Sequence, residues 1–145
     1  MTVSQAMGGG ESKTLRVAHN LQGPQAAVQA IKAAEAFATA AGLREGLAAR
    51  LAIIVEELVL NVYEHGGVSD DACVELVLAR RGSELSLVLE DPGRHFDPRN
   101  AAPPGETPER GGGAGLALVR AWGRVLAYDA TGGVNRLELL MSIDD

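Results

Sequence analysis

The sequence predicts an α+β fold in which helices cover one face of a largely antiparallel sheet. Residues 25–41 and 45–65 show the apolar spacing of amphipathic helices. Residues 72–80 and 84–90 alternate between apolar and polar side chains, which is typical of strands with one buried face. The expected element order is β-α-α-β-β-loop-α-β-β. This order favours helices that lie together on one side of the sheet.

The chain has 145 residues, which fits one domain with a hydrophobic core. We expect residues 12–145 to form this domain. Residues 1–11 are rich in glycine and polar side chains, and we expect a disordered tail there.

The first half of the domain is expected to hold one short strand and two helices. Residues 14–18 alternate well enough for a short edge strand. Pro24 stands where a helix tolerates proline, so the first helix follows it and stops at Gly42. The second helix runs from about Glu45 to His65 and ends at two glycines.

The second half is expected to hold two hairpins separated by a loop and a short helix. Residues 81–83 supply the turn of the first hairpin. Residues 91–113 contain many prolines and glycines and no periodic element, so we expect a functional loop such as a lid. A short helix over 116–122 follows, and two closing strands over 125–128 and 136–141 complete the sheet.

The composition narrows the classes of function. The formal net charge of −6 argues against a nucleic-acid surface, which requires a basic stripe. No apolar run reaches the roughly 18 residues that span a bilayer, and the amino terminus does not resemble a signal peptide. We therefore expect a cytoplasmic protein that binds neither nucleic acid nor membrane. Cys73 is the only cysteine, which excludes an internal disulfide and a thiolate metal cluster.

Lysine usage restricts how a nucleotide could be bound. Lys13 and Lys32 are the only two lysines, so the Gly-Lys-Ser/Thr phosphate loop is absent. Any nucleotide phosphates would have to be neutralised by backbone amides, arginine and a metal ion.

The first motif lies on the second expected helix. Glu57 and Asn61 are four residues apart, so their side chains share one face of an otherwise apolar helix. A carboxylate beside an amide oxygen suits a general base next to a ligand for a hard cation. The alternative is that both side chains lie on the solvated side of an amphipathic helix.

The second motif follows the strand over residues 84–90. Asp91 stands at the end of this strand, where it could accept a hydrogen bond from the exocyclic amine of a purine. Gly93 has no Cβ, so a ligand could approach its backbone closely. The alternative is an ordinary Asp-Pro-Gly turn.

The third motif is a glycine-rich segment before the short helix. Residues 111–115 read Gly-Gly-Gly-Ala-Gly, and a helix that follows such a segment exposes backbone amides that bind anions. Arg110 adjoins it and could reach a phosphate oxygen. The spacing does not fit the dinucleotide-binding fingerprint. The alternative is a flexible linker.

Taken in this order, the three motifs resemble those of the GHKL ATPase superfamily. Within it, the chain is similar to the small serine-protein kinases that act as anti-sigma factors. The resemblance covers residues 15–143, and its most specific parts are the helix motif with His65-Gly66 and the Asp-x-Gly motif followed by Phe96-Asp97-Pro98. It implies the Bergerat type of ATP-binding fold, a two-layer α/β sandwich with a mostly antiparallel mixed sheet and helices on one face.

The resemblance also implies roles for individual residues. Asn61 would ligate Mg²⁺, and Glu57 would be the general base. Asp91 would accept the adenine amine, Gly93 would allow close approach, and residues 111–115 would form the lid over the phosphates. In full, the implied nucleotide-binding residues are Asn61, His65, Asp91, Gly93, Phe96, Arg110, Gly111, Gly112, Gly113, Gly115 and Leu116.

The chain departs from the family pattern in two places. Arg94-His95 stand where many members have a second glycine. A threonine on the penultimate strand commonly supports the adenine site, and the nearest candidates here are Thr131 and Asn135.

The function implied by the resemblance is that of an ATP- and Mg²⁺-dependent serine-protein kinase. Its protein substrate would be an anti-sigma factor antagonist, and a homodimer would sequester a sigma factor. Two alternatives stay open. One is a non-catalytic ATP-binding regulatory domain, and the other is the catalytic domain of a split histidine kinase.

Overall fold

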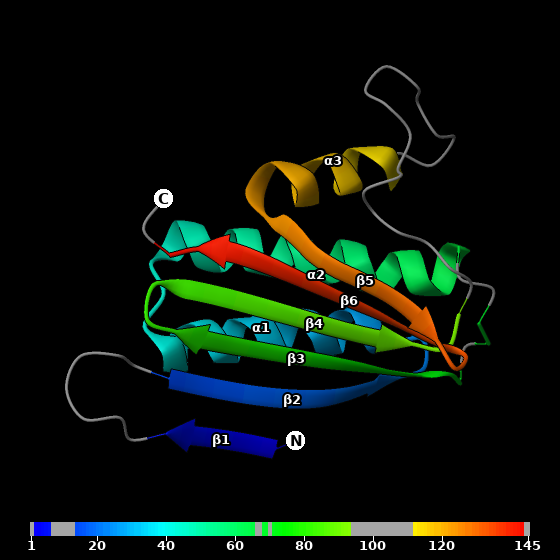
Figure 1. The fold of residues 1–145 in the computed structure, drawn as a ribbon, viewed down its shortest axis with the longest axis horizontal. Coiled ribbons are helices and arrows are strands. Elements are labelled where there is room, and N and C mark those ends of the chain that lie inside the picture. The colour runs from blue at the N-terminus through cyan, green and yellow to red at the C-terminus, as the bar shows by residue number, and fades with distance from the viewer. Residues whose placement is uncertain (1, 7–13, 66–67, 70, 94–111, 144–145) are drawn as a thin grey trace.

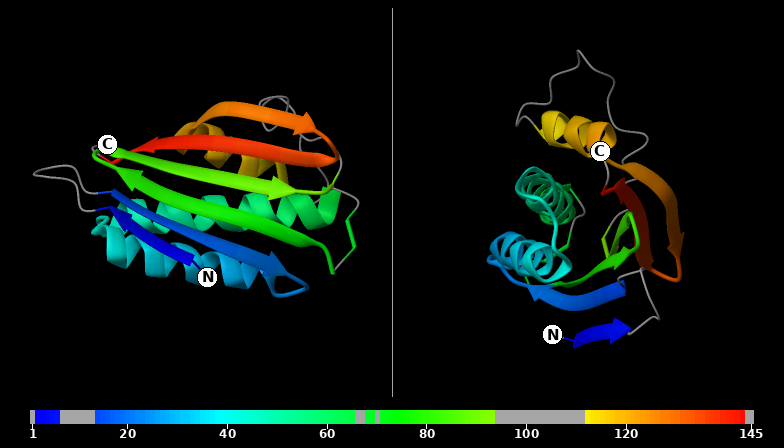
Figure 2. Two further views of the ribbon diagram at one scale, coloured as in Figure 1. Left: turned by 60° about the horizontal axis from the view of Figure 1, so that its bottom comes forward. Right: turned by 90° about the vertical axis from the view of Figure 1, so that its left-hand side faces the viewer.

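A computed structural model of the chain describes residues 2–6, 14–65, 68–69, 71–93 and 112–143. A six-stranded sheet with the strand order β1-β2-β3-β4-β6-β5 forms one layer, and the helices form the other (Figure 1). Figure 2 shows all three helices on the same face of this sheet. The elements are β1 (Thr2–Ala6), β2 (Thr14–Gln22), α1 (Ala26–Ala41), α2 (Glu45–His65), β3 (Cys73–Arg81), β4 (Glu84–Asp91), α3 (Gly112–Trp122), β5 (Arg124–Thr131) and β6 (Val134–Ser142).

The expected α+β fold, a two-layer sandwich with helices on one face, is confirmed. Each of the five strand pairings is antiparallel, so among the described residues the sheet is antiparallel throughout rather than mixed.

The core fills the space between α1, α2 and the sheet. Aliphatic side chains dominate it, and burying each one contributes about 1.5–3 kcal/mol relative to exposure. On α2 the buried positions recur at helical spacing, which is why this segment is a helix with one face against the sheet. The fully buried side chains of α2 include Leu47, Leu51, Ile54, Val55 and Val59.

The end of α1 is fixed by backbone geometry and by one arginine. Gly42 has φ +70°, a left-handed conformation that favours glycine, and it ends the helix where the sequence predicts. The Arg80 guanidinium donates a hydrogen bond to the Ala41 carbonyl over 2.6 Å, which satisfies a carbonyl that the helix leaves unpaired.

The ladder between β4 and β6 joins two interior strands of the sheet, and alternate pairs on it face the helices. We call these pairs the helix-facing ladder. They are Leu85–Met141, Leu87–Leu139, Leu89–Leu137 and Asp91–Asn135. The leucines and the methionine are buried, so the ladder is apolar until its last pair.

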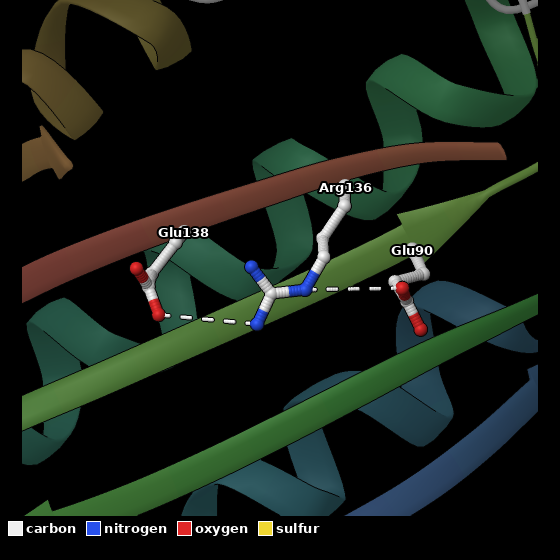
Figure 3. A network of polar contacts seen from close by, with 3 residues as sticks. All are labelled: Glu90, Arg136 and Glu138. Atoms are coloured by element: carbon white, nitrogen blue, oxygen red, sulfur yellow. Dashed lines mark ion pairs between the residues drawn. The ribbon is translucent and has the colours of Figure 1, made fainter. Parts of the chain in front are cut away.

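The opposite face of the sheet carries charged pairs. Arg136 Nε lies 3.9 Å from a carboxylate oxygen of Glu90, and one of its terminal nitrogens lies 3.9 Å from Glu138 (Figure 3). These side chains are partly exposed, so water screens the attraction between them.

The first strand corrects two expectations. Disorder over residues 1–11 is wrong for Thr2–Ala6, which form β1 and pair with β2. The outer edge of β2 carries backbone groups that would otherwise be unpaired, and β1 pairs with them. As a result, β2 has neighbours on both sides and is not the edge strand that the sequence predicts. It also continues to Gln22, beyond the expected end at Ala18.

The closing hairpin and the short helix are both longer than expected. The turn at Gly132-Gly133 has positive φ at both residues, which matches the twist of the flanking strands. The strand β5 therefore extends to Thr131 and β6 begins at Val134. The helix α3 begins at Gly112, four residues before the expected start.

Candidate functional site

The last pair of the helix-facing ladder forms a closed set of hydrogen bonds. Asp91 Oδ1 accepts from the backbone N–H of Gly93 over 2.8 Å and from Asn135 Nδ2 over 3.0 Å. Asn135 Nδ2 also donates to the Gly93 carbonyl over 2.7 Å. Asn135 is only 3% exposed, and it is the one buried polar or charged side chain among the described residues. Its two hydrogen bonds offset the cost of burying the amide.

The local sequence explains this arrangement. Pro92 has no backbone N–H, so it cannot continue the ladder and β4 ends at Asp91. The Asp91 carboxylate then bonds the N–H two residues later, which is the turn that aspartate and asparagine favour. Asn135 lies directly opposite Asp91 in the β4–β6 register and fastens this turn to the neighbouring strand.

The second set of candidate residues lies on α2. Glu57 and Asn61 are both half-buried and are one helical turn apart. Asn61 Nδ2 is buried and has no hydrogen-bond partner in the part of the chain that the structure describes. An unsatisfied buried amide is costly and calls for an explanation, such as a ligand that supplies the missing acceptor.

The Glu57 carboxyl has an altered acidity. Burial raises the pKa of Glu57 above its usual value, and the negative charges of Glu56 and Glu64 raise it further. A carboxyl group whose pKa moves toward neutral pH is a stronger base once it is ionised. Such perturbed groups gather at functional sites.

One hydrogen bond fixes the carboxyl-terminal half of α2 relative to the sheet. The Tyr63 hydroxyl donates to the carbonyl of Ala72 over 2.6 Å, immediately before β3 begins. The part of α2 that carries Glu57 and Asn61 is therefore held in place by the hydrophobic core and by this hydrogen bond, which lies two residues after Asn61.

The fold brings the three motifs to the same end of the molecule. Figure 1 shows that α2 and β4 finish at this end of the molecule and that β6 and α3 begin there. Hydrogen bonds join Asp91, Gly93 and Asn135 directly, and Glu57 and Asn61 share a face of α2.

The remaining predicted site residues fall into two groups. Gly112, Gly113, Gly115 and Leu116 lie in the first turns of α3, not in a preceding loop. Backbone N–H groups of this segment are therefore those of a helix N-terminus, which favours anions. Phe96, Arg110, Gly111 and the side chain of His65, which ends α2, lie outside the described residues.

Side chains of the described residues do not form a metal site on their own. Among these residues, no group of three or more histidine, cysteine, aspartate or glutamate side chains could hold a metal ion. Mg²⁺ typically binds through one or two protein oxygens together with phosphate oxygens and water. The amide oxygen of the half-buried Asn61 is one such protein oxygen, whereas its unpartnered nitrogen is a donor that suits an acceptor atom of the ligand.

A hollow of about 420 Å³ lies at the opposite end of the sheet. Its lining residues come from the β3–β4 turn, the end of α3 and the end of β6, and include Glu84, Trp122 and Arg124. None of the predicted site residues lines it, so it is separate from the motifs.

Comparison with known families agrees with this geometry. The family model for the histidine kinase-like ATPase domain matches residues 22–141. The chain belongs to this family. The match begins at the end of β2 and continues through most of β6, so it contains all three motifs. A search of curated proteins gave no match.

As a histidine kinase-like ATPase domain, the chain is an ATP-binding domain of the GHKL type. Domains of this family bind ATP together with Mg²⁺. None of the helices in the described part of the chain is both long enough and apolar enough to cross a membrane.

The sequence offers two candidates, Thr131 and Asn135, for the residue that supports the adenine site. Thr131 donates its hydroxyl to Asp129 over 2.6 Å at the exposed end of β5, away from Asp91. Asn135 instead bonds Asp91 itself. The turn at Gly132-Gly133 indicates that β6 begins close to Asn135, but the register of β6 against β4, which places Asn135 opposite Asp91, has no local signal in the sequence.

Proposed function

We propose that this ATP-binding domain is an ATP- and Mg²⁺-dependent serine-protein kinase that acts as an anti-sigma factor. Its substrate is a serine of an anti-sigma factor antagonist, and a homodimer of the domain sequesters a sigma factor. The observation that carries the kinase proposal is Glu57, a half-buried carboxyl with a raised pKa one turn before Asn61. The resemblance to anti-sigma kinases supports the choice of partners.

Glu57 acts as the general base in this proposal. It accepts the proton of the serine hydroxyl as the serine oxygen forms its bond to the γ-phosphorus of ATP, and the bond from that phosphorus to the ADP oxygen breaks. Phosphoryl transfer depends mainly on positioning and charge neutralisation, so the base needs only hydrogen-bond reach to the hydroxyl. When bound, Mg²⁺ supplies charge neutralisation at the phosphates, held in part by Asn61.

Nucleotide phosphates and adenine are held by the other motifs. The helix N-terminus at Gly112 and the glycines that follow it favour anions. Asp91 accepts a hydrogen bond from the adenine amine.

Phosphorylation would also release the antagonist. A phosphoserine carries about two negative charges at neutral pH, and the kinase chain has a net charge of −6. Repulsion between them weakens the product complex, so the kinase returns to its sigma factor.

The test is transfer of label from γ-labelled ATP to a candidate antagonist in the presence of Mg²⁺. Wild-type protein should give acid-stable phosphoserine. Glu57→Gln should abolish transfer and retain ATP binding. Glu45→Gln is the matched control, because Glu45 lies in the first turn of the same helix, away from Glu57, and this variant should retain transfer.

Three outcomes would contradict the proposal. Label that is lost in acid would indicate transfer to histidine, as in a split histidine kinase. ATP binding without any labelled protein would indicate a nucleotide-sensing regulatory domain. Loss of ATP binding in Glu57→Gln would show that Glu57 holds nucleotide and is not the base.

A further inference from the structure

The end of α3 is held against α2 by a contact between an arginine and an aromatic ring. The guanidinium carbon of Arg50, on α2, lies 5.5 Å from the centre of the Trp122 ring. This distance is within the range of a cation–π interaction. Both side chains are half-buried, so the contact is partly shielded from water. We call it the Arg50–Trp122 contact.

The chain that leaves α3 is fixed to the sheet at the same point. The Gly123 N–H donates a hydrogen bond to the Val119 carbonyl over 2.9 Å and closes the last turn of the helix. A Cβ at position 123 would lie 3.1 Å from the side chain of Leu139 on β6, so the absence of a Cβ allows this close approach. The carboxyl-terminal end of α3 is therefore attached to both layers of the fold.

The Arg50–Trp122 contact lies on the face of α2 that carries the candidate site. Arg50 precedes Glu57 by seven residues and Asn61 by eleven, which correspond to about two and about three turns of an α-helix. The three half-buried side chains therefore form one stripe along α2. This stripe begins at the contact with Trp122 and reaches the unpartnered amide nitrogen of Asn61.

The same contact determines how far α3 reaches along α2. The two helices touch and run in opposite directions (Figure 1). Asn61 lies about 16 Å beyond Arg50 along the axis of α2. Gly112, the first residue of α3, lies about 15 Å before Trp122 along the axis of α3. With Trp122 held beside Arg50, the start of α3 therefore comes level with Asn61.

We propose that Arg50 and Trp122 are positioning residues for the nucleotide phosphates. Their contact fixes the register of α3 on α2, so that the N-terminus of α3, which favours anions, meets the phosphates beside Asn61. A slip of α3 by one turn would move its free N–H groups by about 5 Å. The inference rests on the proposed contact between the start of α3 and the phosphates, and in this role neither Arg50 nor Trp122 contacts the nucleotide.

The experiment measures two dissociation constants, that of Mg·ATP by calorimetry and that of adenosine by NMR titration. Arg50→Gln removes the cation and keeps a polar side chain. Arg50→Lys restores a cation that can lie over the ring. Arg120→Gln is the matched control, because it removes the same charge from an exposed arginine in the last turn of α3.

Fluorescence reports on the contact itself. Trp122 is the only tryptophan of the chain, so quenching of the emission by acrylamide measures the accessibility of this ring. Quenching should increase in Arg50→Gln and stay close to wild type in Arg50→Lys. Unchanged quenching in Arg50→Gln would show that the arginine does not cover the ring, which would overturn the inference.

Arg50→Gln should weaken Mg·ATP binding about fivefold, the factor that a half-exposed cation–π contact supports, and should leave adenosine binding unchanged. Adenosine has no phosphate, so a shift of α3 does not affect it. Arg50→Lys should stay within about twofold of wild type, and Arg120→Gln should match wild type. Equal weakening of both ligands would overturn the inference, because a merely structural role changes both, and so would unchanged Mg·ATP binding.

A second variant tests the other partner of the contact. Trp122→Leu keeps an apolar side chain and removes the ring, so it should weaken Mg·ATP binding as much as Arg50→Gln does. The variant with both substitutions should bind no more weakly than either single variant, because each one removes the same contact. Losses that add up in the double variant would overturn the inference.

Failure of the kinase proposal is distinguishable from failure of this inference, because neither affinity requires a protein substrate. A wild-type chain that binds Mg·ATP but phosphorylates no protein removes the kinase function and leaves the role of Arg50 and Trp122 intact. Transfer of phosphate by a wild-type chain whose Arg50→Gln variant binds Mg·ATP equally well removes their role and leaves the kinase function.

Discussion

The two ends of the helix-facing ladder differ in what they bury. At one end, Leu85 and Met141 pair within the core. At the other end, Asp91 and Asn135 occupy the equivalent positions, and hydrogen bonds take the place of apolar contact. Both ends face the helix layer, so the polar pair cannot be explained as a solvated surface. Two sheet positions that could have been apolar hold a hydrogen-bonded polar pair instead.

The same contrast separates the hollow from the end of the molecule that carries the motifs. The hollow near Trp122 lies at the apolar end of the ladder and is lined by none of the three motifs. The motif end holds the buried Asn135, the unpartnered amide of Asn61 and the raised pKa of Glu57. The unpartnered amide and the raised pKa each cost folding free energy, and together with the buried polar pair they are typical of a site built for a ligand.

The largest effect on stability is expected at the apolar end. Leu87→Ala removes a side chain that is 1% exposed, and we expect the free energy of unfolding to fall by about 2–5 kcal/mol. Urea denaturation followed by circular dichroism measures this change. The ATP affinity of the folded fraction should be unaffected, and a loss of affinity would show that the two ends are coupled.

A smaller loss of stability and a larger loss of function are expected for Asp91→Ala. The variant takes away one of the two acceptors of Asn135 Nδ2, and we expect the free energy of unfolding to fall by about 1 kcal/mol. ATP affinity, measured by calorimetry, should fall at least about tenfold because the acceptor for the adenine amine is gone. Unchanged affinity would remove Asp91 from the site.

Glu57→Gln should make the fold more stable at neutral pH and equally stable in acid. Because the pKa of Glu57 is raised in the fold, the unfolded chain ionises first as pH rises, and the charged form disfavours folding. Removing the charge therefore raises the melting temperature at pH 7 but not below the usual pKa of glutamate. Thermal denaturation at both pH values measures the difference, and a lower melting temperature at pH 7 would contradict the account.

The smallest effect is expected on the open face of the sheet. The 3.9 Å contacts of Arg136 with Glu90 and Glu138 involve partly exposed side chains, so Arg136→Gln should change the free energy of unfolding by no more than about 0.5 kcal/mol. Urea denaturation at low and high salt tests this. A loss of several kcal/mol would show that the charged pairs hold the sheet together.

Local pattern was enough to predict the helices and the hairpins. The bounds of α2 agree with the sequence analysis because its apolar spacing is regular and two glycines follow it. Gly42 marked the end of α1 for the same local reason. The motifs at Glu57, Asn61, Asp91 and Gly93 could be read as short patterns, and the fold brings them to one end.

What could not be predicted depends on contacts between distant segments. The partner of Asp91 is 44 positions away, and it is defined only by the register of β6 against β4. The strand β1 depends on the free edge of β2, which no pattern within residues 1–11 reveals. The helix α3 begins with glycines that disfavour helices, so local propensity did not predict its start.

The most direct test is to titrate Mg·ATP into isotopically labelled protein and to map the changes in backbone amide chemical shifts. We predict changes concentrated at Asn61, Gly93 and Asn135, with Glu84, Trp122 and Arg124 around the hollow unchanged. Changes confined to the hollow, or a spectrum that does not respond to Mg·ATP, would contradict the assignment of nucleotide binding to the polar end of the ladder.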